Sequence, residues 1–288
     1  MAEATERTSE LLVTLLGDYW FASTEHIPSA ALAALLGEFG VRPDATRAVL
    51  SRAARRGRLE GTRSGRTTAY RLAPELRELA TGLGRALMAF GAEPIAWDGT
   101  WTCVAFSVPE ADRRLRLALR NRLRALGFGA LFDGLWISPD PPDEEVDVTL
   151  RRLGITTAAV LRVTEVARAG GVDLRSAWDL DGVRKRYDEF LAGLDAIAPR
   201  IDEGSIGSAE ALALRTDLLA RWRGLVTTDP RLPDELMPDD WPRAEARRRF
   251  AAAYDALGPL AEARVRQVVA PWPATPPPRH HRVDDLLR

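Results

Sequence analysis

Residues 8–73 are divided by prolines and glycines into short segments, and this division constrains the fold more than any other feature. Three of the segments carry apolar residues at helical spacing: residues 8–21, 27–41 and 43–56. Gly40 and Gly57 follow the second and third segments, where glycine commonly ends a helix. Thr8 or Ser9 is suited to cap the first. The pattern predicts three short helices in succession.

A β-hairpin is expected directly after the third helix. Residues 58–63 and 66–72 have strand-like composition, and Ser64-Gly65 between them suits a tight turn in which Gly65 takes a positive φ. Three helices followed by a hairpin form a winged helix-turn-helix, in which the third helix enters the DNA major groove. The hairpin, or wing, then reaches the neighbouring backbone or minor groove.

Charge is concentrated in the same region. Residues 42–71 hold nine arginines against Asp44 and Glu60, whereas the whole chain has a net charge of −1. On a helical wheel of the third segment, Thr46, Val49, Leu50 and Ala53 face one side, and the basic residues face the other side or its flank. The predicted DNA contacts are Arg47, Ser51, Arg52 and Arg55 on the helix and Arg63 and Arg66 on the wing. Solvated surface arginines, or a wing that docks a protein, remain the alternatives.

The rest of the chain predicts further domains. We expect a winged helix-turn-helix over 8–73, a linking helix over 74–95, a ferredoxin-like α+β domain over 96–173, a helical domain over 174–270 and a disordered tail over 271–288. The middle domain is predicted from the order strand, helix, strand or hairpin, helix, strand. The tail is rich in proline, which favours disorder. The fold class is therefore α+β and multidomain.

The sequence offers little support for catalysis or a cofactor. Cys103 is the only cysteine, which excludes an internal disulfide and a multi-cysteine zinc site. His26, His280 and His281 have no partner at metal or triad spacing, and we expect the last two to be solvated. We therefore predict no enzyme, no metal and no cofactor. With no secretion signal and no long apolar run, the expected location is the cytoplasm.

Four blocks give the chain a resemblance to a known family. They are "IPSAALAALLGEFGVRPDATRAVLSRAARRGRLEG", "LRALGFGALFDGLWISP", "WDLDGVRKRYDEFL" and "DPRLPDELMPDDWP". In this order they resemble the PaaX family of bacterial transcriptional regulators. The resemblance implies a winged helix, a middle domain related to a CRISPR-associated small nuclease and a helical C-terminal domain. It also implies a repressor of aromatic-catabolism genes that an aryl-acyl-CoA releases from DNA.

The resemblance also bears on the roles of the later domains. Ser107 stands where the related nucleases need an acidic metal ligand, so cleavage of nucleic acid is not expected, and the middle domain is expected to serve dimerisation. An acyl-CoA needs cations for its phosphates and an aromatic or apolar wall. The candidate effector residues in the C-terminal region are Trp178, Arg184, Arg186, Tyr187, Trp222 and Arg223. The tryptophans could equally be core residues, and the arginines solvated charges.

The expected partners follow from these roles. We predict a homodimer that binds double-stranded DNA at a palindromic operator, because one recognition helix reads only a few base pairs. The expected effector is phenylacetyl-CoA or another acyl-CoA. Two other functions stay open: an enzyme that processes CoA esters, and a protein-docking winged-helix adaptor.

Overall fold

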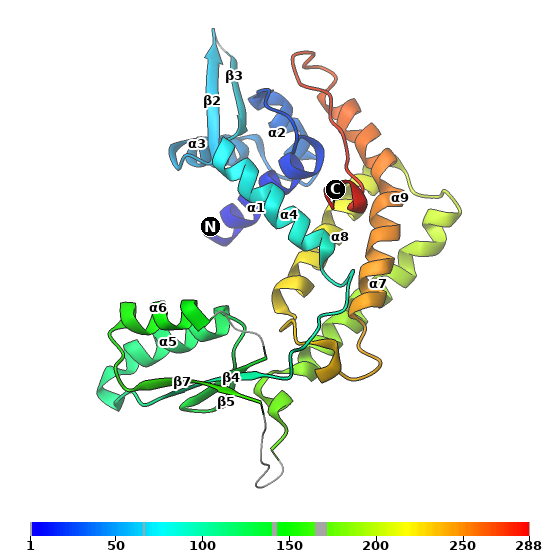
Figure 1. Cartoon of the computed structure of the whole chain (residues 1–288). Coiled ribbons are helices and arrows are strands. Elements are labelled where there is room, and N and C mark those ends of the chain that lie inside the picture. Colours follow the sequence, from blue (N-terminus) through cyan, green and yellow to red (C-terminus); the bar gives the residue numbers. More distant parts are fainter. Residues whose placement is uncertain (1, 66, 140–142, 165–171, 288) are drawn as a thin grey trace. The chain divides into compact units, whose positions relative to one another are not determined.

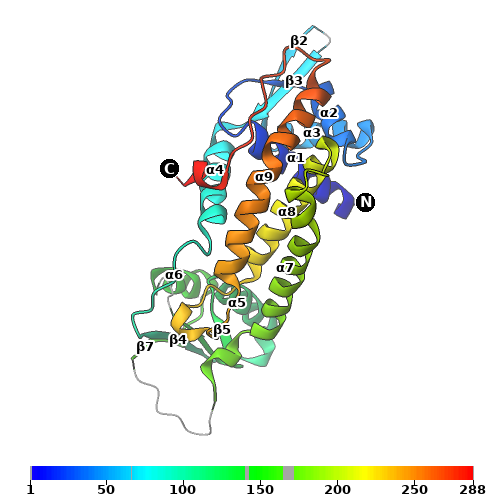
Figure 2. The same cartoon turned by 90° about the vertical axis from the view of Figure 1, so that its right-hand side faces the viewer.

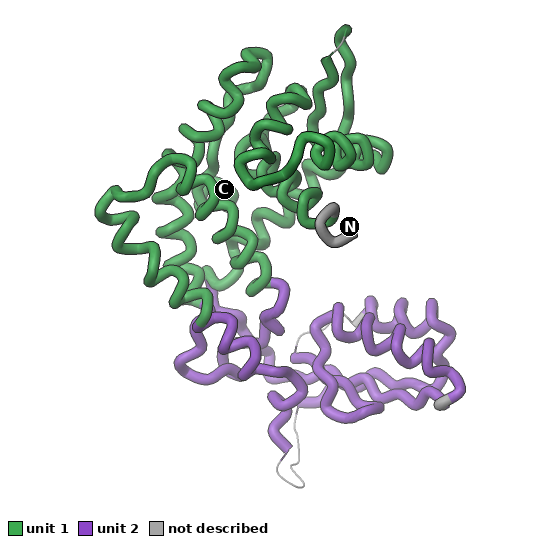
Figure 3. Tube along the Cα trace, turned by 180° about the vertical axis from the view of Figure 1, so that it is seen from behind, with its two compact units in different colours: residues 1–92, 189–226, 244–288 green, residues 93–188, 227–243 purple. Residues whose placement is uncertain are grey.

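The computed structural model describes residues 2–65, 67–139, 143–164 and 172–287. These fall into two compact units that interleave along the sequence. Unit 1 comprises residues 1–92, 189–226 and 244–288, and unit 2 comprises residues 93–188 and 227–243 (Figure 3). No helix in the described part of the chain has both the length and the apolar character that a membrane span requires.

Unit 1 begins with three helices and a small antiparallel sheet (Figure 1). The elements are α1 (Ala2–Tyr19), β1 (Ile27–Pro28), α2 (Ser29–Gly37), α3 (Pro43–Arg55), β2 (Leu59–Ser64) and β3 (Thr67–Leu72). The strand order is β1-β3-β2. These positions confirm the predicted second and third helices and the hairpin, in which Gly65 has a φ of 58°. The predicted cap of the first helix at Thr8 or Ser9 is wrong, since no glycine or proline interrupts the good helix formers before it.

The remaining elements of unit 1 are long helices. α4 (Pro74–Ala89) follows the hairpin directly. The three later helices run beside one another in Figure 2: α7 (Leu180–Asp202), α8 (Ser208–Thr228) and α9 (Arg243–Val269). Of these, α7 enters unit 1 only from Glu189 onward.

One apolar core joins the start and the end of unit 1. It contains Leu12, Leu15 and Leu16 of α1, Leu32, Leu35 and Leu36 of α2, Val49 and Leu50 of α3, Leu212 of α8, and Leu257 and Val265 of α9. Two regions that the sequence assigns to separate domains thus share a core. The reason is that α8 and α9 bury apolar side chains against the three N-terminal helices instead of only against each other.

The last residues of unit 1 are packed, which contradicts the predicted disordered tail over 271–287. The indole Nε1 of Trp20 donates to the Pro276 carbonyl at 2.8 Å, and the Arg279 amide donates to the Tyr19 carbonyl at 2.9 Å. A short 3₁₀ turn, η4 (Val283–Leu286), then buries both of its terminal side chains. Proline favours an extended chain that needs few internal hydrogen bonds, so a proline-rich segment can lie along helices as well as in solvent.

Unit 2 is built on a four-stranded antiparallel sheet with two helices on one face (Figure 1). In chain order the elements are β4 (Trp101–Phe106), η1 (Glu110–Asp112), α5 (Arg113–Ala125), β5 (Gly129–Phe132), β6 (Leu135–Ser138), α6 (Asp143–Leu153), β7 (Ala158–Val163) and η2 (Leu174–Ala177). The strand order is β5-β6-β4-β7. Val104 and Trp136 of the sheet pack against Leu119, Leu123 and Val146 of the helices. Residues 227–243, with η3 (Asp234–Leu236), join this unit through an amide of Asp234 that donates to the Ile95 carbonyl at 3.0 Å.

Candidate nucleic-acid interface

Helix α3 has one buried face and one exposed face, as its sequence predicts. Thr46, Val49 and Leu50 are 0–2% exposed, and Ala53 is partly buried against the same core. The residues on the opposite side are all exposed: Asp44, Arg47, Ala48, Ser51 and Arg55. Pro43 begins the helix, where its missing amide hydrogen costs nothing, and Gly57, with a φ of 66°, follows its end. The local sequence thus fixes which side chains face solvent.

The cations on and beside α3 are largely uncompensated. Arg55 and Arg56 are exposed and Arg52 is half-buried at the flank. Among the described residues these three side chains form no ion pair. Arg47 is the exception, because its guanidinium pairs with Asp44 one turn earlier, and both side chains are well exposed. An exposed pair of this kind contributes little to stability and exchanges readily for another anion.

Two further arginines extend this basic surface beyond the predicted contacts. Arg42 precedes α3 and Arg58 lies between α3 and β2, and both are exposed without an ion pair among the described residues. The sequence signal for them is the local charge excess, which includes both positions. We name the exposed or half-buried arginines in and beside α3 the α3 basic surface: Arg42, Arg47, Arg52, Arg55, Arg56 and Arg58.

The β2–β3 hairpin contributes a smaller set of cations. Arg63 is exposed, and its Nε donates to the Gly65 carbonyl at 3.3 Å across the turn. Arg66 lies outside the described residues. Arg71 has a structural role instead, since it donates to Glu60 at 2.8 Å and to the Thr24 carbonyl at 2.7 Å.

The structure divides the candidate effector residues between the two units. Trp178, Arg184, Arg186 and Tyr187 belong to unit 2, whereas Trp222 and Arg223 belong to unit 1. Trp222 is fully buried, stacks on Phe250 with ring centroids 4.8 Å apart, and donates from Nε1 to the Leu87 carbonyl at 2.9 Å. Trp222 is thus packed within the core of unit 1. Its neighbour Arg223 donates to the Thr14 hydroxyl at 3.2 Å.

In unit 2 the candidates surround the first turns of α7. Arg184 pairs with Asp240 at 2.8 Å and with Asp188 at 3.5 Å, and Arg186 donates to the Thr228 hydroxyl at 3.1 Å. Trp178 donates to the Gly127 carbonyl at 3.3 Å and packs near Trp101, with ring centroids 6.3 Å apart. These residues lie in one unit, but each already has a polar partner within the chain.

Tyr187 anchors a buried polar group that the sequence did not predict. Its hydroxyl donates to the Asp229 carboxylate at 2.7 Å, and Arg243 donates to the same carboxylate at 3.0 Å. Burial, followed by the Asp229 charge, raises the pKa of the Tyr187 hydroxyl above its ordinary value. Arg243 also pairs with Asp234 at 2.8 Å. This group fixes residues 229–243 against α7, and it leaves Tyr187 in a structural role.

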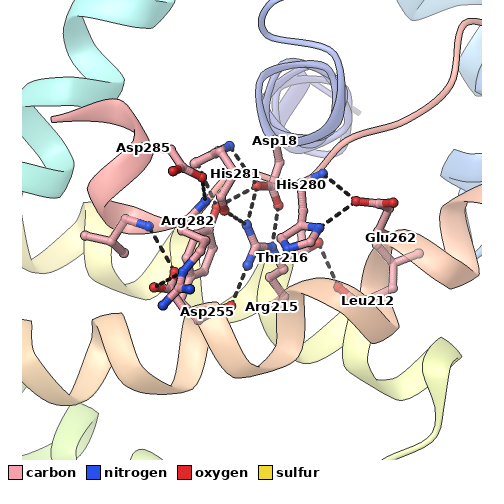
Figure 4. Close-up of polar contacts among 12 residues, drawn as sticks. Asp18, Leu212, Arg215, Thr216, Asp255, Glu262, His280, His281, Arg282 and Asp285 are labelled. Carbon is pink, nitrogen blue, oxygen red and sulfur yellow. Dashed lines mark hydrogen bonds and ion pairs between the residues drawn. The ribbon is translucent and has the colours of Figure 1, made fainter. Parts of the chain in front are cut away.

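A second buried polar network lies in unit 1 and centres on Arg215 of α8 (Figure 4). Its guanidinium donates twice to the Asp18 carboxylate, at 3.1 and 2.9 Å, and to the His281 carbonyl at 2.8 Å. It also lies over the Tyr254 ring, 3.5 Å from the centroid, and the Tyr254 hydroxyl donates to Asp18 at 2.6 Å. We name these four residues the Arg215 network. It connects α1, α8, α9 and the C-terminal segment at one point.

Burial and charge set the protonation of the Arg215 network. Burial opposes ionisation of Asp18, but the Arg215 guanidinium outweighs it and holds the Asp18 pKa below 3.8. Burial lowers the pKa of His281 from 6.5, so the imidazole favours its neutral form. The prediction that His281 is solvated is therefore wrong, as its side chain is 5% exposed. His280 is partly buried too and bonds to Glu262 through Nδ1 at 2.6 Å.

No cluster of His, Cys, Asp or Glu suited to hold a metal ion occurs among the described residues. The free Cys103 on β4 is half-buried, and burial raises the pKa of its thiol. A thiol with a raised pKa forms less of the reactive thiolate.

Comparison with known proteins gives consistent matches along the chain. Residues 7–76 match the model of a PaaX-like protein, residues 94–174 that of the PaaX protein central Cas2-like domain, and residues 178–267 that of the PaaX-like protein C-terminal domain. The transcriptional repressor PaaX of Escherichia coli K12 is 26% identical over 266 residues, covering 90% of this chain and 83% of that protein. The solved structure of the uncharacterized protein Rv0674 from Mycobacterium tuberculosis is 26% identical, with a TM-score of 0.57, and the match covers 88% of this chain and 97% of that one.

Proposed function

The chain belongs to the PaaX family, and from this premise we propose that it is a cytoplasmic transcriptional repressor that binds double-stranded DNA. In this proposal α1, α2, α3 and the β2–β3 hairpin form a winged helix-turn-helix. Helix α3 enters the major groove, and the hairpin, with Arg63, reaches the neighbouring phosphates. Arg47 and Ser51 face the base edges, while Arg52 and Arg55 flank them.

The observation that carries the proposal is the uncompensated charge of the α3 basic surface. A solvated helix gains from pairing its cations with nearby acids, as Arg221 does with Asp217 on α8. The α3 basic surface has Asp44 as its one acidic partner among the described residues. Phosphates supply the missing negative charge, and their neutralisation releases counterions, which provides much of the affinity of proteins for DNA.

We assign unit 2 a role in assembly. The order β4-α5-β5-β6-α6-β7 supports a ferredoxin-like sandwich as the fold of this domain. In the proposed regulator this domain contributes to a homodimer, and the homodimer reads two inverted half-sites of a palindromic operator. The half-sites are separated by whole helical turns, so that both α3 helices meet the same side of the duplex.

We further propose that a small-molecule acid or its CoA thioester, with phenylacetyl-CoA as the first candidate, releases the repressor from DNA. Arg184 and Arg186 on the first turns of α7 and Trp178 just before it are its proposed contacts. The Asp240 partner of Arg184 is exposed and the partners of the other two are half-buried, so a phosphate or an acyl group can replace them. A ligand releases DNA only if it favours the state that cannot bind DNA. By linkage, DNA then weakens ligand binding by the same factor, typically about 5- to 150-fold.

The DNA-binding proposal is tested by recovering and sequencing the fragments that the purified protein retains from sheared genomic DNA. We expect an inverted repeat among them. The test variant is Arg47→Ala/Arg52→Ala/Arg55→Ala. Its control is Arg113→Ala/Arg114→Ala on α5, whose arginines are also exposed. Loss of the repeat only in the triple variant supports the proposal. Retention of the repeat in the triple variant, or no enriched sequence at all, contradicts it and favours a protein-docking adaptor.

The effector is tested by calorimetric titration of phenylacetyl-CoA, free CoA and phenylacetate, with and without operator DNA. We expect one of them to bind, more weakly when DNA is present, and Arg186→Ala to reduce the affinity. Equal affinity with and without DNA contradicts an inducer. Turnover of the CoA ester during the titration would instead support the enzyme alternative.

A further inference from the structure

Helix α4 presents an apolar stripe to solvent, although its opposite side packs within unit 1. On its inner side Met88 is buried. On its outer side Leu79 is 58% exposed and Leu83 is 62% exposed, which makes Leu83 the most exposed large apolar side chain of the described residues. The two leucines are four residues apart and therefore lie one above the other on the same face.

The helix surface beside these leucines is recessed, because a glycine stands there in place of a larger side chain. Gly82 lies on the exposed face, and a Cβ placed on it would meet no atom within 4 Å. A shallow hollow over this glycine is bounded by Arg77, Glu78, Thr81 and Arg85. Helices pack at about 8 to 10 Å between axes, and small residues at the crossing point allow the shorter distances. The exposed side of α4 therefore has the shape of a helix-packing face, with two leucines to bury and a hollow beside them.

The charges beside the stripe identify what can cover it. Glu78 and Arg85 are both exposed, lie seven residues apart, and form no ion pair within the described part of the chain. The midpoint between them falls at Thr81 and Gly82. An antiparallel copy of the same helix, related by a two-fold axis at this midpoint, would set each Glu78 opposite the partner's Arg85. A two-fold axis uses the same surface on both copies, so two ion pairs form while four leucines are buried together.

We propose that α4 is a dimer contact: it packs antiparallel against α4 of a second copy of this chain, centred on Gly82. The proposal rests on the dimeric regulator proposed above and names a contact surface for it. Because α4 follows the β2–β3 hairpin within unit 1, the contact sets the distance and two-fold relation between the two α3 helices. It is separate from any contact that unit 2 makes.

Disulfide cross-linking of the full chain tests this geometry directly. Gly82→Cys, in a Cys103→Ser background, places two thiols at the two-fold axis, and we expect a covalent dimer to form rapidly under mild oxidation. The control is Thr62→Cys in the same background, which is also exposed in unit 1 but lies on β2. Cross-linking of Gly82→Cys at the slow rate of Thr62→Cys would overturn the proposal.

Charge reversal tests the pairing of Glu78 with Arg85. In the Gly82→Cys background, Glu78→Arg alone and Arg85→Glu alone each set like charges opposite each other, and we expect cross-linking about tenfold slower. The two changes together restore opposite charges, and we expect a rate within about threefold of the parent. A double variant as slow as the single variants would overturn the antiparallel arrangement.

Light scattering separates this proposal from the proposed function. Leu79→Glu/Leu83→Glu should dissociate or weaken the dimer, whereas Leu260→Glu, 41% exposed on α9, should leave it intact. A chain that dimerises and binds operator while Gly82→Cys fails to cross-link contradicts the α4 contact and leaves the DNA-binding proposal standing. A monomer at micromolar concentration with the stripe intact contradicts the α4 contact, and a different partner then covers the stripe. Arg47→Ala, which should impair only DNA binding, is expected to cross-link at the parental rate.

Discussion

At the scale of single residues, Arg47 is expected to recognise a specific base of the operator. It lies near the centre of the exposed face of α3, and its one ion-pair partner among the described residues is the exposed Asp44. If the guanidinium reads a base edge, Arg47→Ala weakens specific binding by about 1 to 3 kcal/mol and relaxes the preference at that base pair. Titration of operator and of single-base variants measures both effects. Equal weakening on all sequences would instead assign Arg47 to the phosphates.

Two residues of the Arg215 network make stability depend on pH. The folded chain resists protonation of His281, whose pKa burial lowers from 6.5, while the unfolded chain accepts the proton. The stabilising contribution of neutral His281 is therefore complete above about pH 6.5 and decreases as the pH falls below it. Asp18 acts in the same direction at lower pH, because its pKa lies below 3.8 in the folded chain and its contribution is lost as the pH falls through the folded value.

Denaturant unfolding between about pH 7.5 and pH 5 measures the effect of His281. We expect the free energy of unfolding to fall with pH in the parent and to fall less in His281→Gln. Thr62→Gln, an exposed change on β2 outside the network that removes no titratable group, is the control and should keep the parental slope. The same slope in His281→Gln as in the parent would exclude His281 as the source.

At the scale of elements, the β2–β3 hairpin and α3 are expected to contribute differently to DNA binding. Arg63 at the hairpin is exposed and suited to a phosphate. Arg63→Ala should therefore weaken binding to all sequences alike and lower the slope of log affinity against log salt concentration by about one. Titrations at several salt concentrations measure this slope. An unchanged slope would remove the hairpin from the interface.

The elements themselves were largely predictable from the sequence because their signals are local. Pro43 and Gly57 delimit α3 and alternating exposure distinguishes its faces, so its bounds and its buried side were predicted. The start of α1 was missed because no residue near Thr8 prevents a helix from extending toward Ala2. The role of Trp222 could not be predicted, since an aromatic residue at helical spacing looks the same whether it lines a core or a pocket.

At the scale of the whole molecule, the sequence could not predict the interactions that join distant segments. Asp18 and Arg215 are 197 residues apart, and each looks like an ordinary helix surface charge in its own segment. The same holds for Asp229 and Arg243, although they are only 14 residues apart, because their burial depends on α7. Their burial is a product of tertiary packing, and single-sequence periodicity does not report it.

The buried pair of Asp18 and Arg215 is expected to be essential to unit 1. Arg215→Met leaves the Asp18 carboxylate buried without its cation, which should cost about 3 to 5 kcal/mol of the free energy of unfolding. The double variant Asp18→Asn/Arg215→Met should recover part of this loss, because no unpaired charge remains. Arg221→Met, which breaks the exposed pair with Asp217 on the same helix, should cost no more than about 1 kcal/mol. If Arg215→Met lowers the free energy of unfolding no more than Arg221→Met does, the buried pair has no stabilising role.

The packed C-terminal segment has a consequence for how the protein is made. During synthesis α1 leaves the ribosome about 200 residues before Arg215 and about 260 before Arg279, so Asp18 and the Tyr19 carbonyl lack these partners until the later residues are made. A nascent chain can form α2, α3 and the hairpin early, but it cannot complete unit 1 until Arg215 and Arg279 emerge. A chain truncated before Arg215 would therefore keep Asp18 without its guanidinium and leave unit 1 unfinished. Only a chain that extends past Arg279 is then expected to fold unit 1 fully.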